Sequence, residues 1–150
     1  GCAGIVAAFN LDEKERPVTG TVSAADVPGL PSGKYVLFDY FARSAVVLDE
    51  GERLPLELFD YDDFRLFFLL PYEEPAVPVG LISKYMSSAT FTKLAPGKWL
   101  AHEGGEFCIF SELPLAEVYA GGKPVKTTQL GENLFVATLP DADGQVLLEI

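Results

Sequence analysis

Cysteine and histidine are considered first, because together they can form a nucleophile with its base or hold a metal. His102 is the only histidine of the 150 residues, and Cys108 follows it across Gly104 and Gly105. If both lie on neighbouring strand segments, the imidazole could deprotonate the thiol. Cys108 lies in the apolar run FCIF, however, where a buried and inert thiol is more typical. With one histidine and two cysteines, a Cys/His metal site also has too few ligands in this chain. We therefore expect no catalytic residue, no metal site and no cofactor.

Clustered carboxylates are the second group that could do chemistry, because they bind hard cations such as Ca²⁺. Asp60, Asp62 and Asp63 stand in the sequence DYDD, which lacks the loop glycine and the later glutamate of an EF-hand. A solvated turn between strands explains them better. Asp141 and Asp143 precede a glycine, and Asx-type turn chemistry accounts for them equally well.

Aromatic side chains are the remaining candidates, because flat rings stack on the apolar faces of sugars when polar groups lie beside them. The predicted sugar-binding residues are Trp99, Tyr85 and Tyr119. Packing in the core or against another domain is the competing interpretation for aromatics in a β-rich chain. Both interpretations stay open at the level of the sequence.

Charge and hydropathy exclude two classes of partner. With 22 acidic and 11 basic residues, the net charge is −11, whereas phosphate binding needs clustered Lys and Arg. We expect no binding to nucleic acid. The longest apolar run, residues 66–71, is far shorter than the ~20 residues of a membrane helix. Cys2 and Cys108 could pair, but two cysteines define no disulfide framework, so the compartment stays open.

The elements that position these residues are predicted to be strands. Short β-branched and aromatic runs alternate with turn residues, and helical periodicity is nearly absent. Residues 4–9, 18–24, 35–41, 44–48, 54–59 and 64–70 read as strands, and further strands follow residue 89. The prolines of residues 71–78 favour an extended connection. The sequence therefore predicts an all-β fold, an antiparallel β-sandwich of about ten to twelve short strands, as one domain over residues 1–150.

Four segments then follow one another in a distinctive order. They are GIVAAFN, ending in Phe9 and Asn10; TGTVSAADVPGL; the block from YVLFDYF to FFLLPY; and PVGLISKYMSSATF. In this order they resemble the C-terminal region of the raffinose synthase and seed imbibition proteins of glycoside hydrolase family 36. The loop after Asn10 is shorter than in that family and lacks its tryptophan and cysteine. Ser83 and Ser87 stand where those proteins usually carry Asp and Asn.

The resemblance implies a non-catalytic β-sandwich domain of a larger carbohydrate enzyme. In that family the two catalytic carboxylates belong to a (β/α)₈ barrel upstream of the matched region, so none is carried over to this chain. The implied partner is the barrel of the same polypeptide, of a raffinose-type transferase or an α-galactosidase. The predicted interdomain contact residues are Pro78, Val79, Leu81, Tyr85 and Met86. The alternative is a carbohydrate-binding module that uses a pair of exposed coplanar rings.

Overall fold

The computed structural model describes residues 3–14, 16–60, 62–85, 87–141 and 145–150. These residues form fourteen strands and two short 3₁₀ helices, and the strand pairings are antiparallel. The predicted all-β, antiparallel and sandwich-like fold is confirmed, with more strands than expected. No helix in the described ranges combines the length and the apolar character that crossing a bilayer requires.

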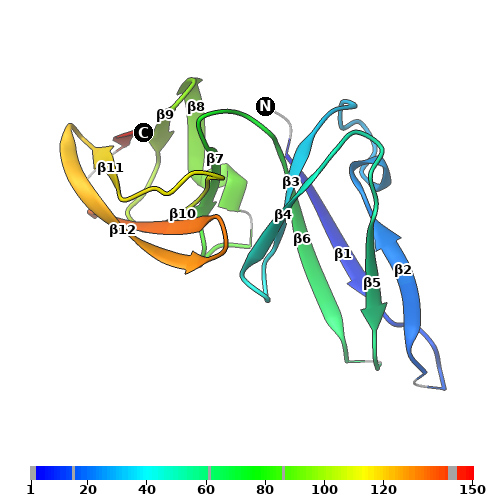
Figure 1. Ribbon diagram of the computed structural model, residues 1–150. Coiled ribbons are helices and arrows are strands. Elements are labelled where there is room, and N and C mark those ends of the chain that lie inside the picture. The colour runs from blue at the N-terminus through cyan, green and yellow to red at the C-terminus, as the bar shows by residue number, and fades with distance from the viewer. Residues whose placement is uncertain (1–2, 15, 61, 86, 142–144) are drawn as a thin grey trace. The chain divides into compact units, whose positions relative to one another are not determined.

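The chain divides into two compact units, Cys2–Pro71 and Tyr72–Ile150. We call them the N-terminal unit and the C-terminal unit (Figure 1). The expectation of a single domain over residues 1–150 stays a prediction, and each unit is described by itself.

The N-terminal unit consists of a four-stranded sheet and a two-stranded sheet. The larger sheet has the order β1-β6-β3-β4, and β2 pairs with β5 in the smaller one. The strands are β1 (Gly4–Phe9), β2 (Val18–Val22), β3 (Tyr35–Asp39), β4 (Ser44–Leu48), β5 (Leu54–Leu58) and β6 (Phe64–Pro71). The 3₁₀ helix η1 (Ala24–Asp26) follows β2.

A core cluster lies on one face of the larger sheet. Because side chains alternate between the two faces of a strand, Tyr35 and Leu37 of β3 point to the same side as Phe67 and Leu69 of β6. The buried members of the cluster are Val22, Tyr35, Leu37, Leu48, Phe67 and Leu69. Partly buried side chains of β1, β5 and η1 pack against the cluster, including Val6, Leu54 and Ala24. The smaller sheet and η1 thus cover one face of the larger sheet.

The C-terminal unit is built on one eight-stranded sheet with the order β7-β10-β13-β12-β11-β14-β9-β8. The strands are β7 (Val77–Leu81), β8 (Phe91–Ala95), β9 (Lys98–Ala101), β10 (Gly105–Phe110), β11 (Glu117–Ala120), β12 (Lys123–Gly131), β13 (Leu134–Leu139) and β14 (Val146–Glu149). The sheet curls around a core that includes Trp99, Phe107, Ile109, Val118 and Leu148.

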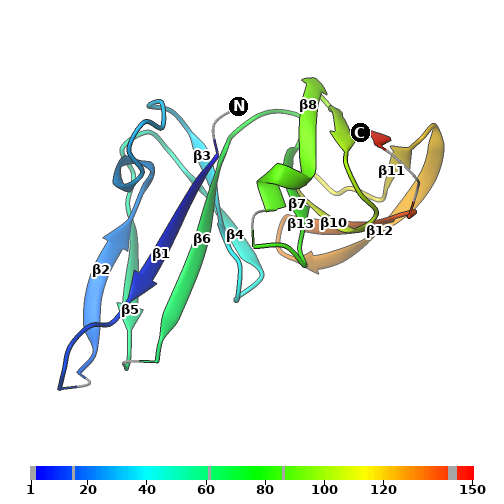
Figure 2. The same cartoon turned by 180° about the vertical axis from the view of Figure 1, so that it is seen from behind.

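The 3₁₀ helix η2 (Ser87–Thr90) contacts both edge strands of this sheet, β7 and β8 (Figure 2). The hydroxyl Oγ1 of Thr90 accepts a hydrogen bond from the backbone N–H of Leu81 at 3.1 Å and donates one to the carbonyl of Ser87. Gly80 lets η2 approach this closely, because its φ is +101° and a Cβ there would lie 2.1 Å from the Ser87 carbonyl oxygen. Gly80 therefore has a structural reason to be glycine.

Candidate functional site

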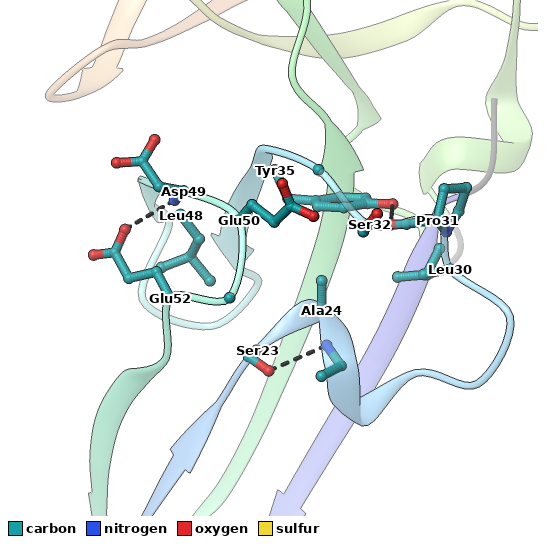
Figure 3. A pocket seen from close by; sticks show the side chains of 13 residues that line it. Ser23, Ala24, Leu30, Pro31, Ser32, Tyr35, Leu48, Asp49, Glu50 and Glu52 are labelled. Carbon is teal, nitrogen blue, oxygen red and sulfur yellow. Dashed lines mark hydrogen bonds between the residues drawn. The ribbon is translucent and has the colours of Figure 1, made fainter.

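A cleft of about 320 Å³ opens at one end of the N-terminal unit, and we call it the turn cleft (Figure 3). Three segments surround it: η1 with the residue before it, the loop that leads into β3, and the turn between β4 and β5. The lining residues are Ser23, Ala24, Ala25, Leu30, Pro31, Ser32, Gly33, Tyr35, Leu48, Asp49, Glu50, Gly51 and Glu52. Its size is at the small end of ligand pockets, which suits a small molecule or a single side chain.

The floor of the turn cleft is apolar. Tyr35 and Leu48 are buried members of the unit's core, and Leu30 packs against the same core. The phenol of Tyr35 donates a hydrogen bond to the carbonyl of Pro31 at 2.7 Å, which fixes the ring beneath the loop (Figure 3). The floor is therefore already formed in the absence of a ligand.

A network around Arg53 fixes the wall made by η1. The Oγ of Ser23 accepts from the backbone N–H of Ala25 at 3.1 Å, and the carboxylate of Asp26 accepts from the backbone N–H of Ser23 at 2.8 Å. Ser23 and Asp26 form a capping box, the reciprocal arrangement that starts a helical turn. The guanidinium of Arg53 donates to Thr21, to Ser23 and, through Nη2 at 2.9 Å, to Asp26. It thereby ties η1 to the start of β5.

The ionisation of Asp26 follows from this network. Burial alone would raise the pKa of Asp26, and it is the largest single influence. The hydrogen bonds from Arg53 and from the backbone of Ser23, together with the charge of Arg53, outweigh burial and hold the pKa below its usual value. Asp26 is thus a carboxylate at neutral pH, and it is committed to Arg53.

The rim of the turn cleft is acidic. Asp49, Glu50 and Glu52 come from one turn, and no lysine or arginine is among the described lining residues. The carboxylate of Glu52 accepts from the backbone N–H of Asp49 at 2.8 Å and so closes the turn. Within the described residues, no ion pair engages Glu50. The cleft joins an apolar floor to a negative mouth, an arrangement for binding.

A second cleft, of about 540 Å³, lies in the C-terminal unit and runs from Tyr72 to Ala76 and from Phe110 to Leu113. The phenol of Tyr72 donates to the carboxylate of Glu112 at 3.1 Å. Burial and the Glu112 carboxylate raise the pKa of Tyr72 above its usual value. The carboxylate of Glu73 is engaged by Lys93 and by the indole N–H of Trp99. Three polar side chains of this cleft, those of Tyr72, Glu73 and Glu112, are thus already hydrogen-bonded.

A cluster of rings lies at one end of the four-stranded sheet, on the face that points away from Phe67 and Leu69. Phe64 stacks on Phe9, with ring centroids 4.8 Å apart, and meets Phe41 edge-on at 5.5 Å. Phe41 in turn contacts Tyr40. Phe9 is 58% exposed and Phe41 is 49% exposed. We call Phe9, Phe41 and Phe64 the aromatic face.

The three predicted sugar-binding residues are not brought together as a pair of platforms. Trp99 is 0% exposed and belongs to the core, so the assignment of its ring to sugar stacking is corrected. β9, which carries Trp99, lies between β14 and β8, and its buried face points into the core. Tyr85 is 62% exposed and Tyr119 is 44% exposed, and both remain candidates.

The predicted interdomain residues also have a different position from the one expected. Pro78, Val79 and Leu81 are buried along β7. Leu81 packs in the core of its own unit, which corrects its assignment as an exposed contact residue. Tyr85 is exposed, and Met86 lies outside the described residues. The exposed rings of Phe9 and Phe41 lie outside this segment, on the aromatic face.

The remaining chemistry-bearing residues serve the fold. The ring nitrogens of His102 contact Thr92 at 2.8 Å and Gln145 at 3.1 Å, whereas Cys108 is buried, as predicted. The structure does not pair the two as nucleophile and base. Cys2 lies outside the described residues, so its pairing is untested.

The first acidic cluster forms a turn, as predicted. The side chain of Asp60 accepts from the backbone N–H of Asp62 at 3.0 Å, and that of Asp63 accepts from the N–H of Phe59 at 3.0 Å. No group of three or more metal-ligating side chains occurs in the part of the chain that the structure describes. In the second acidic segment, Asp141 is described and Asp143 is not.

Two features of the structure were missed by reasoning from the sequence. The turn cleft is lined by loops that are distant from one another in the sequence. Its only local signal in the sequence was the acidic turn at residues 49–52. The aromatic face had a signal in the alternation of Ile5, Ala7 and Phe9 along β1. A comparison with protein-family models finds no match to this chain, and no curated protein matches it.

Proposed function

We propose that this chain is a non-catalytic all-β module of a larger carbohydrate enzyme of the family 36 type. In this proposal it packs against a catalytic (β/α)₈ barrel of the same polypeptide. The ordered resemblance of four segments supports the family, and the all-β fold agrees with it. The aromatic face is the observation that carries the docking role, because it concentrates exposed apolar rings on one side of a sheet.

The area of the aromatic face is modest. A phenylalanine side chain can bury ~150–250 Å², so two rings exposed by about half present on the order of 200 Å². Ile5, on the same side of β1, is also exposed. Patches of a few hundred Å² occur on ordinary monomers, so area alone does not decide. The composition of the aromatic face supports the docking role, since aromatic residues are enriched in the cores of protein interfaces.

The chemistry of the aromatic face favours a protein surface over a sugar. Phenylalanine rings have no hydrogen-bonding group, whereas a sugar site needs polar groups beside its stacking platform. Phe9 and Phe41 both contact Phe64, so the three rings form one apolar surface. An apolar surface of a partner domain would cover all three rings without leaving sugar hydroxyls unpaired.

The proposal is tested on the polypeptide that carries this chain and on the 150-residue chain alone. The double variant Phe9→Ser and Phe41→Ser removes the aromatic face at its two exposed rings. We expect it to lower the thermal midpoint of the parent polypeptide by several degrees more than that of the isolated chain. The assay is thermal unfolding, with hydrolysis of an aryl α-galactoside as the measure of parent activity.

Tyr119→Ser is the matched control, because Tyr119 is an exposed aromatic residue of the other unit. It should shift both midpoints alike. Equal shifts for the double variant in parent and isolated chain would remove the docking role. Galactoside hydrolysis by the isolated chain would remove the non-catalytic role.

A further inference from the structure

The turn cleft has a composition that selects one kind of ligand. Its floor of Leu30, Tyr35 and Leu48 offers apolar surface. Its mouth carries the carboxylates of one turn and, among the described lining residues, no basic side chain. The carboxylates at the mouth repel anions. A purely apolar ligand would leave these carboxylates without a partner of opposite charge. A cation with an apolar stem satisfies both parts.

We propose that the turn cleft binds an alkylammonium group, the chemistry shared by the lysine side chain of a polypeptide and a free aliphatic amine. The methylene stem lies on the ring of Tyr35 and on the neighbouring aliphatic side chains. The ammonium lies at the mouth, beside the carboxylate of Glu50. This proposal is independent of the docking role of the aromatic face.

The position of the carboxylates supports this assignment. Asp26 is committed to Arg53, and Glu52 to the backbone of Asp49, so neither needs a ligand. Glu50 lies at the tip of the turn, and Figure 3 shows its side chain directed toward the ring of Tyr35. None of the three rim carboxylates forms an ion pair in the described residues, and that of Glu50 is the one directed toward the aromatic part of the floor.

The cleft is also held open for a ligand. The bond from Tyr35 to Pro31 fixes one side, and the bonds from Arg53 to Ser23 and Asp26 fix the other. Binding therefore needs little ordering of the protein, which is one of the main costs of association. The ligand group has few atoms, so we expect weak binding in the millimolar range.

The test is a titration of the ¹⁵N-labelled chain with n-butylammonium, followed through backbone amide shifts. We expect saturable shifts at Ala24, Gly33 and Gly51, which weaken as salt is raised from about 0.02 to 0.5 M. n-Butanol has the same stem without the charge and should bind more weakly, and butyrate should not bind. A second series with Nα-acetyl-lysine amide and with a lysine-containing tetrapeptide distinguishes a free amine from a peptide side chain. Tighter binding of the peptide assigns the site to a polypeptide partner.

Glu50→Gln is the variant that tests the role of the mouth. We expect it to weaken n-butylammonium binding about two- to fivefold, the range of an exposed ion pair. Glu57→Gln removes the same charge from β5, outside the cleft, and should leave binding unchanged. Equal binding of butanol and butylammonium would overturn the proposal. So would the absence of saturable shifts, or equal effects of the two variants.

Discussion

Substitution of Gly80 by alanine should be the most damaging single-methyl change in the C-terminal unit. The backbone at Gly80 has φ +101°, a conformation that costs a non-glycine residue ~1–3 kcal/mol. The new Cβ would also lie 2.1 Å from the carbonyl oxygen of Ser87, so η2 must move away from β7. That movement breaks the two hydrogen bonds of Thr90, each with a net value of ~0.5–1.5 kcal/mol. The expected loss is about 2–6 kcal/mol in the free energy of unfolding.

Trp99 provides the assay, because it is the only tryptophan and is buried in the core of this unit. Its fluorescence during urea unfolding reports on the C-terminal unit. With an m-value of ~1–3 kcal/mol/M, the midpoint should fall by at least about 0.7 M. Gly121→Ala is the control that has the backbone strain without the steric clash. Gly121 has φ +58°, but a Cβ there would meet no atom within 4 Å. It should cost only ~1–2 kcal/mol. A Gly80→Ala midpoint within the error of the wild type would refute the reasoning.

Three further predictions concern single side chains. Asn10→Ala should cost about 2–4 kcal/mol, measured by urea unfolding followed by circular dichroism, because its buried amide donates to the carbonyls of Arg16 and Leu58. Trp99→Ala should cost ~3–5 kcal/mol in the same assay through loss of core packing; an unchanged stability would contradict the placement of this ring in the core. In the folded protein the pKa of Asp26 lies below its ordinary value of 3.8. The ionised Asp26 therefore contributes fully to stability above pH 3.8, and this contribution is lost as the pH falls through the folded pKa. Unfolding between about pH 5 and pH 2 should therefore show a smaller acid-induced loss of stability in Asp26→Asn than in the wild type, and equal losses would contradict the network around Arg53.

Much of the fold could be predicted because strands have a strong local signal. Residues 4–9, 44–48 and 134–139 alternate or are uniformly apolar between turn residues, and the structure has β1, β4 and β13 with these bounds. β7 was missed because prolines usually interrupt strands. Pro78 is tolerated because β7 is an edge strand, paired only with β10.

The candidate sites were harder to predict, because they depend on which face of a strand a side chain occupies. The sequence around Trp99 does not show that its strand would lie between two others with the ring pointing inward. The turn cleft depends on η1, which the sequence suggested only as the end of a strand over residues 18–24. The serine and aspartate of its capping box, Ser23 and Asp26, were the local signal that a helical turn begins there.

The most direct test of the docking role is amide hydrogen exchange of β1 in the isolated chain and in the polypeptide that carries it. β1 is an edge strand that pairs only with β6, and it carries Ile5 and Phe9 on its exposed face. Alternate amides of an edge strand have no partner in the sheet and exchange readily. The account predicts that a peptide covering residues 4–9 exchanges more slowly in the parent polypeptide, while a peptide covering β12 is unchanged. Equal exchange of residues 4–9 in both forms would contradict it.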